Sequence, residues 1–120
     1  MKFYSRKLIK AGDLNPRGTL FGGQLLKWID EEAAIYAICK LGTSELVTKY
    51  MSEVNFIAPA FKGDIIEIGM EVESVGKTSL TLTCEVRNKI TMEPIVKIDK
   101  IVFVHVSKQN RPLEHNGLIR

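Results

Sequence analysis

The sequence predicts an α+β fold in which an antiparallel sheet packs against one long helix. A single helical pattern covers residues 22–41, and the segments after it alternate apolar and polar residues as strands do. One early strand, one helix and then a run of strands favours an antiparallel sheet packed on one helix. With 120 residues, 45% of them hydrophobic and 26% charged, we expect one soluble domain over residues 1–120.

The elements are expected in a simple order along the chain. A first strand with poor alternation covers residues 2–10, and a loop rich in turn-forming residues follows at 12–18. The helix covers 22–41 and ends at Gly42. The polar tail from Lys108 is expected to be loose. Four further strands are predicted at 46–57, 64–75, 78–88 and 94–106.

Alternation is clearest in the two middle strands. In the strand at 64–75, apolar side chains face one way, whereas Glu67, Glu71 and Glu73 face the other. The strand at 78–88 repeats the pattern, and the short connection between the two predicts a hairpin.

The helix carries more apolar surface than one sheet face would cover. Its apolar residues fall on three sides: Leu25, Ile29 and Tyr36; Trp28, Ile35 and Cys39; and Leu26, Ala33, Ala37 and Leu41. A helix that is apolar nearly all round is buried nearly all round. In the last strand, residues 101–104 are also apolar on both faces. We therefore expect a second copy of the chain to cover the helix in a homodimer.

Charge and cysteine content restrict the partners and the compartment. The net charge is +3 with scattered basic residues, so the basic stripe of a nucleic-acid-binding protein is missing. No apolar run approaches the roughly 20 residues of a membrane span, and we expect no signal peptide. Cys39 and Cys84 are expected to be small buried residues of a protein in the reducing cytoplasm.

The start of the helix is the first candidate for chemistry. Gly22 and Gly23 leave backbone N–H groups open to an oxygen that gains negative charge. A paired glycine is also typical of a tight turn or a closely packed helix start. In the preceding loop, Asn15 either forms a turn ahead of Pro16 or orients a water molecule or a carbonyl group.

Asp30 is the leading candidate for a reacting acid. Its helical neighbours include Leu26, Ala33 and Ala37, so we expect the carboxylate to lose hydration, which strengthens it as a base. The alternative is a surface acid without a role. Glu32 ranks second, because its longer side chain reaches water more easily.

The distance between these two features implies a shared site. Seven residues separate Gly23 from Asp30, which is about 10 Å along a helix axis. The helix-start amides and the Asp30 carboxylate of one chain are thus too far apart to act on one carbonyl carbon. If both serve one site, two antiparallel helices from two subunits must bring them together.

Two further features are weaker candidates. The segment Gly76-Lys77-Thr78-Ser79 either is only a hairpin turn or contacts a phosphate group. His105 and His115 have no acid and nucleophile close in sequence, so neither a Ser-His-Asp arrangement nor a zinc site is supported.

The loop and helix start resemble those of hotdog-fold acyl-CoA thioesterases of the YciA and cytosolic acyl-CoA hydrolase type. The resemblance lies in Asn15, Gly18 and Phe21-Gly22-Gly23, followed by Asp30 on the helix. It continues in Val54-Asn55-Phe56-Ile57, Pro59, Gly63-Asp64 and Val75-Gly76-Lys77-Thr78-Ser79, and it spans about residues 3–107.

The resemblance implies the hotdog fold, an antiparallel sheet wrapped around one long central helix. It implies hydrolysis of acyl-CoA to free CoA and a carboxylic acid, without a metal or redox cofactor. Pairs of domains would form a continuous sheet, often assembled further into tetramers or hexamers. The site would lie at the dimer interface, with the asparagine from one subunit and the helix acid from the other.

The same resemblance implies a role for each site residue. Asp30 would be the general base or the nucleophile, Asn15 would position water or substrate, and the Gly23 amide would polarise the thioester carbonyl. The residues implied in substrate binding are Phe21, Gly22, Asn55, Gly76, Lys77, Thr78 and Ser79, the last four at the CoA portion.

Two other functions on the same fold remain possible at this point. A non-catalytic acyl-CoA sensor or carrier would have no need of the acid, so Asn15 together with Asp30 counts against it. A hydratase or dehydratase would normally need a histidine near the helix start, and the sequence has none there.

Overall fold

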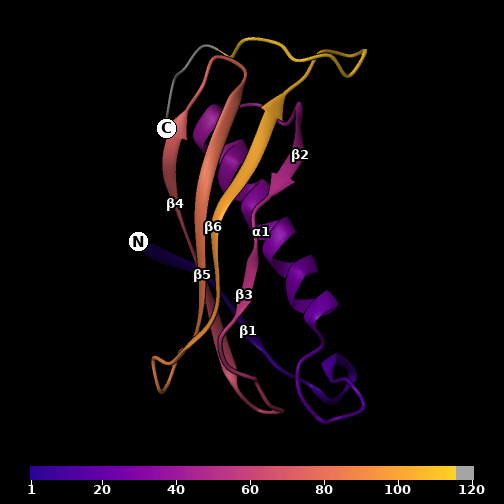
Figure 1. Ribbon diagram of the computed structural model, residues 1–120, viewed down its shortest axis with the longest axis vertical. Coiled ribbons are helices and arrows are strands. Elements are labelled where there is room, and N and C mark those ends of the chain that lie inside the picture. The colour runs from indigo at the N-terminus through magenta and orange to yellow at the C-terminus, as the bar shows by residue number, and fades with distance from the viewer. Residues whose placement is uncertain (116–120) are drawn as a thin grey trace.

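In the computed structural model, which describes residues 1–115, one long helix lies along one face of a six-stranded antiparallel sheet (Figure 1). The strands are β1 (Lys2–Leu8), β2 (Leu46–Met51), β3 (Val54–Phe56), β4 (Ile65–Val75), β5 (Ser79–Asn88) and β6 (Pro94–His105). The helix α1 covers Gly22–Leu41, and a short 3-10 turn, η1, covers Ala11–Asp13. The α+β prediction is confirmed. Apart from the segment 46–57, the predicted strand limits agree with the structure within one or two residues.

Strands β1 and β2 lie at the two opposite edges of the sheet. Its order is β1-β4-β5-β6-β2, and β3 also pairs with β6, on the same side as β2. All pairings are antiparallel. The helix ends at Gly42, whose positive φ of 69° and N–H bond to Ile38 O form the expected stop.

One predicted strand is interrupted. The segment 46–57 forms two strands, β2 and β3, that keep the same register against β6 on either side of the break. At the break the Ser52 hydroxyl accepts the Lys100 N–H at 3.0 Å. A side-chain oxygen thus takes the position of a backbone acceptor, which interrupts the ladder.

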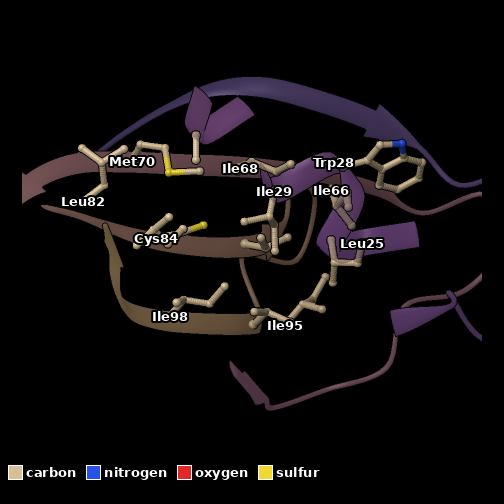
Figure 2. Packing of buried hydrophobic residues seen from close by; sticks show 14 of the residues in the cluster. Leu25, Trp28, Ile29, Ile66, Ile68, Met70, Leu82, Cys84, Ile95 and Ile98 are labelled. Atoms are coloured by element: carbon tan, nitrogen blue, oxygen red, sulfur yellow. The ribbon is translucent and has the colours of Figure 1, made fainter. Parts of the chain in front are cut away.

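The core lies between α1 and the concave face of the sheet. Figure 2 shows Leu25 and Ile29 of the helix among side chains of β4, β5 and β6. The residues at its centre are fully buried: Ile29, Ile66, Leu82 and Ile98. Cys84 belongs to this core, and its burial raises the pKa of the thiol to about 12.

Two expectations about exposure and order are wrong. Cys39 is exposed, and it lines a cavity between α1 and the strands β1 and β4. The tail after Lys108 is not loose up to residue 115, because Leu113 N–H bonds to His105 O and His115 N–H to Lys77 O. Glu67 lies on the outer face, as the alternation predicts, and is buried there.

No helix within residues 1–115 is both long and apolar enough to cross a membrane.

Candidate functional site

The N-terminus of α1 is open in the way that an oxyanion site requires. Phe21 is the N-cap and provides no side-chain cap, and the first turn contains no acid. Within residues 1–115, the N–H groups of Gly22, Gly23 and Gln24 have no protein acceptor. These unpaired donors and the helix dipole together favour a negative oxygen at this point.

The two glycines differ in their surroundings. A Cβ on Gly22 would lie 3.3 Å from the Phe56 ring of β3, so any larger residue there would require this partly exposed ring to shift. A Cβ on Gly23 would meet nothing within 4 Å. Gly23 therefore faces open space, which a substrate can enter.

Asn15 does form the predicted turn, and this limits what its side chain can do. Its Oδ1 accepts the backbone N–H groups of Arg17 at 2.9 Å and Thr19 at 3.2 Å. Its Nδ2 donates to Thr19 Oγ1 at 2.9 Å. Both acceptor sites of the amide oxygen are used, so the second Nδ2 hydrogen is what Asn15 can offer to a ligand. Asn15 can act as a donor, not as an acceptor.

Asn15 and Gly22 line the same cavity, of about 430 Å³. Most of its wall is apolar: Leu20, Leu25, Phe56, Ile57, Ala58, Pro59, Ala60 and Ile95, with Thr19 beside Asn15. Phe21 is 48% exposed next to it. Asn55 does not line the cavity, because it alternates with Phe56 along β3 and points to the other side of the strand.

Asp30 does not line that cavity either and is held by the edge strand β2. Thr48 Oγ1 donates to Asp30 Oδ1 at 2.9 Å. The prediction that Asp30 loses its hydration is wrong for the single chain, in which the residue is exposed. Its helical neighbours Ala33 and Ala37 are buried against the sheet, whereas Asp30 is turned toward the edge of the sheet.

Thr48, which no pattern in the sequence singled out, is the residue that binds the Asp30 carboxylate. Its hydrogen bond to Asp30 joins two residues that are 18 positions apart in the sequence, and it depends on how β2 lies against the helix. The register of β2 against β6 shifts between Thr48 and Tyr50, and such a bulge redirects side chains locally. No periodicity in the sequence signals this contact.

The second-ranked acid, Glu32, has a structural partner. Its carboxylate lies 3.6 Å from Lys7 Nζ of β1. It lines another cavity, of about 330 Å³, together with Tyr4, Ile35, Tyr36, Cys39, Lys40, Ile68 and Met70. This cavity contains none of the predicted site residues.

The segment 76–79 forms the predicted hairpin turn. Gly76 N–H donates to Ser79 O at 3.0 Å, and a Cβ on Gly76 would meet Ser79 Oγ at 2.5 Å. Lys77 is exposed. Thr78 and Ser79 line a third cavity, of about 330 Å³, with Lys49, Asn110, Pro112 and four valines of β2, β6 and the residue after β6. The chain therefore distributes the predicted residues over three places.

Within residues 1–115, no three or more histidine, cysteine, aspartate or glutamate side chains are grouped as metal ligands would be.

The chain is similar to known thioesterases in sequence and in structure. It is 31% identical over 106 residues to the acyl-CoA thioester hydrolase YciA of Escherichia coli (strain K12), covering 85% of this chain and 80% of the relative. A hexameric hotdog fold thioesterase of Campylobacter jejuni superposes with a TM-score of 0.78 at 28% identity, covering 93% and 88% of the two chains.

An acyl-CoA hydrolase from Staphylococcus aureus, solved with butyryl-CoA, CoA and CoA disulfide, superposes with a TM-score of 0.82 at 27% identity. The match covers 92% of this chain and 66% of that one. That enzyme has also been solved with an asparagine, an aspartate or a threonine replaced by alanine. These likenesses confirm the predicted hotdog fold. The model of the thioesterase superfamily matches residues 17–95, and this chain belongs to that family.

Proposed function

We propose that this protein hydrolyses acyl-CoA thioesters to free CoA and a carboxylic acid. The observation that carries the proposal is the open N-terminus of α1, beside an apolar cavity that also holds the free donor of Asn15. A thioester carbonyl has the acceptor that these donors need, and an acyl chain suits the apolar wall. The relatives with a known name act on acyl-CoA.

The chemistry needs a carboxylate and an oxyanion site on either side of the carbonyl carbon. In one route, Asp30 takes a proton from a water molecule while the oxygen of that water attacks the carbonyl carbon. In the other route, the Asp30 carboxylate itself attacks the carbon and forms an anhydride, which water then hydrolyses. The Gly23 N–H and Asn15 Nδ2 donate to the carbonyl oxygen as it becomes negative. The C–S bond then breaks, the sulfur leaves as CoA, and the acid retains an oxygen from water.

Thr48 positions the carboxylate for this step. Its hydroxyl donates a hydrogen bond to Asp30 Oδ1, so Oδ2 is the oxygen that we propose for the reaction. An asparagine, an aspartate and a threonine are also the residues replaced in the Staphylococcus aureus variants. In this chain Thr48 contacts Asp30, whereas Asn15 would come from the other copy of the proposed dimer.

The active unit we propose is a dimer in which each site takes Asn15 and Gly23 from one copy and Asp30 from the other. Strand β2, which holds Thr48, is an edge strand with Val47 and Tyr50 exposed at 43% and 54%. Edge strands of this kind pair readily with another copy, which extends the sheet. Two sheets joined at β2 also bring the two copies of α1 and the two Asp30 residues to the middle of the dimer. By analogy with the hexameric relatives, such dimers would assemble further into tetramers or hexamers.

We place the CoA portion at the hairpin of residues 76–79. The cavity there has hydroxyl donors from Thr78 and Ser79 and an ammonium group from Lys49, and Lys77 is exposed beside it. Cations and hydroxyl groups of this kind suit phosphate oxygens. The cavity includes Val47 of the same edge strand, so it adjoins the proposed dimer interface. Phe21, which is exposed next to the Asn15 cavity, and Asn55 of β3 remain proposed substrate contacts.

A thiol-release assay tests the activity. Purified protein is given acyl-CoA substrates of increasing chain length, and released CoA is measured with a thiol-reactive dye. Cys39 is exposed and adds one reacting thiol per chain, whereas Cys84 is buried, so Cys39→Ser supplies the low-background enzyme. Binding of acyl-CoA without CoA release would favour a sensor or carrier over the enzyme.

The shared site has its own test by mixing. We expect Asp30→Asn to lower kcat about 10²–10⁴-fold, as loss of a catalytic acid–base group does, and Asn15→Ala about 10²–10³-fold, as loss of one oxyanion donor does. When the two variants are denatured and refolded together, heterodimers contain one intact site and should recover up to half of the activity per dimer. Absence of recovery in isolated heterodimers would show that the two residues act within one chain.

The two cysteines support a reducing compartment for this activity, because neither is in a disulfide, and we propose the cytoplasm.

A further inference from the structure

Asp13 is the buried acid nearest to the open helix start, and the proposed reaction gives it no direct role. It is 6% exposed, at the end of the 3-10 turn η1 and two residues before Asn15. Its Oδ2 accepts the Lys10 N–H at 2.9 Å, and its Oδ1 accepts Gln24 Nε2 at 3.0 Å. Its backbone oxygen accepts the N–H of Phe21 at 2.9 Å. A buried acid with three such contacts is an anchor between two segments.

Gln24 occupies the third position of α1, where a glutamine usually caps its own helix. In a capping box this side chain accepts the N–H of the N-cap residue. Here the N-cap is Phe21, and its N–H goes to Asp13 instead. The amide of Gln24 is likewise turned to the Asp13 carboxylate. Asp13 thus binds the two groups that would otherwise pair in a capping box, the Phe21 N–H and the Gln24 side chain.

We propose that Asp13 and Gln24 are positioning residues that fix the Asn15 loop against the first turn of α1. This inference rests on the proposed function, because it assumes that Asn15 and Gly23 act on one carbonyl oxygen. The two donors belong to different segments, and the Asp13–Gln24 link is the side-chain contact that joins the turn before Asn15 to the helix. Displacement by a fraction of an ångström weakens an oxyanion site more than it weakens substrate binding.

Gln24→Met tests the link, because methionine has a similar length and no amide. We expect kcat to fall about tenfold with little change in KM, the effect of one lost hydrogen bond expressed in the transition state. Gln109→Met makes the same chemical change in the exposed tail and should leave kcat unchanged. Wild-type kcat in Gln24→Met would overturn the proposal.

Two further variants separate positioning from a general structural effect. In an Asn15→Ala background, Gln24→Met should lower kcat by less than about twofold, because the donor that the link positions is already gone. The full tenfold loss in that background would overturn the proposal. Asp13→Asn should keep kcat within about threefold of wild type, because Gln24 can turn its amide oxygen toward the new amide group. A loss as large as that of Gln24→Met would show that charge, not the hydrogen-bonded link, is what matters.

Hydrogen exchange tests the link without using activity. Gln24→Met should speed amide exchange in the segment 13–24 and leave β4–β6 unchanged, whereas Asp13→Asn should leave the segment near the wild-type rate. Unchanged exchange in Gln24→Met would overturn the link itself. If the wild-type protein bound acyl-CoA without hydrolysing it, the proposed function would fail, and this measurement would still decide whether the link fixes the loop.

Discussion

Thr48 donates a hydrogen bond to the carboxylate on which the proposed reaction depends. A carboxylate on an exposed helix face can rotate, and a fixed hydroxyl on one oxygen restricts it to a single useful orientation. The Asn15 side chain is restricted in a similar way, because three local hydrogen bonds leave one hydrogen for the substrate. Each reacting side chain is thus oriented by neighbours before any ligand binds.

We expect Thr48→Val to lower kcat about tenfold, because loss of a hydrogen bond to a charged group costs about 1.5 kcal/mol. Valine has the shape of threonine without its hydroxyl. Thr48→Ser keeps the hydroxyl and should retain most of the wild-type kcat. Steady-state kinetics with one acyl-CoA checks both variants, and an equal loss in the two would refute a role for the hydroxyl.

Among the elements, β1, β4 and β5 are joined by an ion cluster on the face of the sheet opposite the helix. Glu67 of β4 has a side chain that is only 3% exposed. It lies 2.6 Å from Arg87 Nε of β5 and 3.5 Å from Arg6 Nε of β1. The Arg87 guanidinium also lies 3.6 Å from the centre of the Phe3 ring. The alternation of β4 correctly predicts the face of Glu67, but the cover from β1 and β5 determines its burial.

We expect Arg87→Ala to lower the free energy of unfolding by about 3 kcal/mol, because the buried Glu67 charge loses its closer partner and keeps only the more distant Arg6. Arg6 contacts the same carboxylate, but its side chain is 62% exposed, so Arg6→Ala should cost at most about 1 kcal/mol. Urea denaturation monitored through Trp28 measures both values. Equal losses would mean that burial of Glu67 does not govern the strength of these pairs.

For the whole molecule, the arrangement of the elements explains why the proposed site residues of one chain lie apart. The open helix start and Asn15 lie together at one cavity, whereas Asp30 lies farther along α1 beside β2. The unpaired edge of β2 is the surface through which the proposed dimer completes the site.

We expect the double variant Val47→Lys/Tyr50→Lys to separate the dimer, because a twofold interface at β2 brings the new charges of one copy close to those of the other. Kcat should fall with the loss of dimer, since each site needs two chains. The matched variant Ile90→Lys/Met92→Lys adds the same charge at the exposed β5–β6 connection and should leave both properties unchanged. Sedimentation velocity and the thiol-release assay measure the two effects. A dimeric, active edge variant would place the interface elsewhere.

The sequence by itself determined the helix, its stop at Gly42, the strands of the antiparallel sheet and the resemblance to thioesterases. These features depend on periodicity, turn residues and short motifs, all of which are local. The break in 46–57 was not predictable, because it arises from Ser52 facing Lys100 across the sheet. The exposure of Asp30 and Cys39, the burial of Glu67 and the contacts of Thr48 and Asp13 also belong to the tertiary structure. Each of them depends on which distant segment packs against the residue, and no spacing along the chain records that.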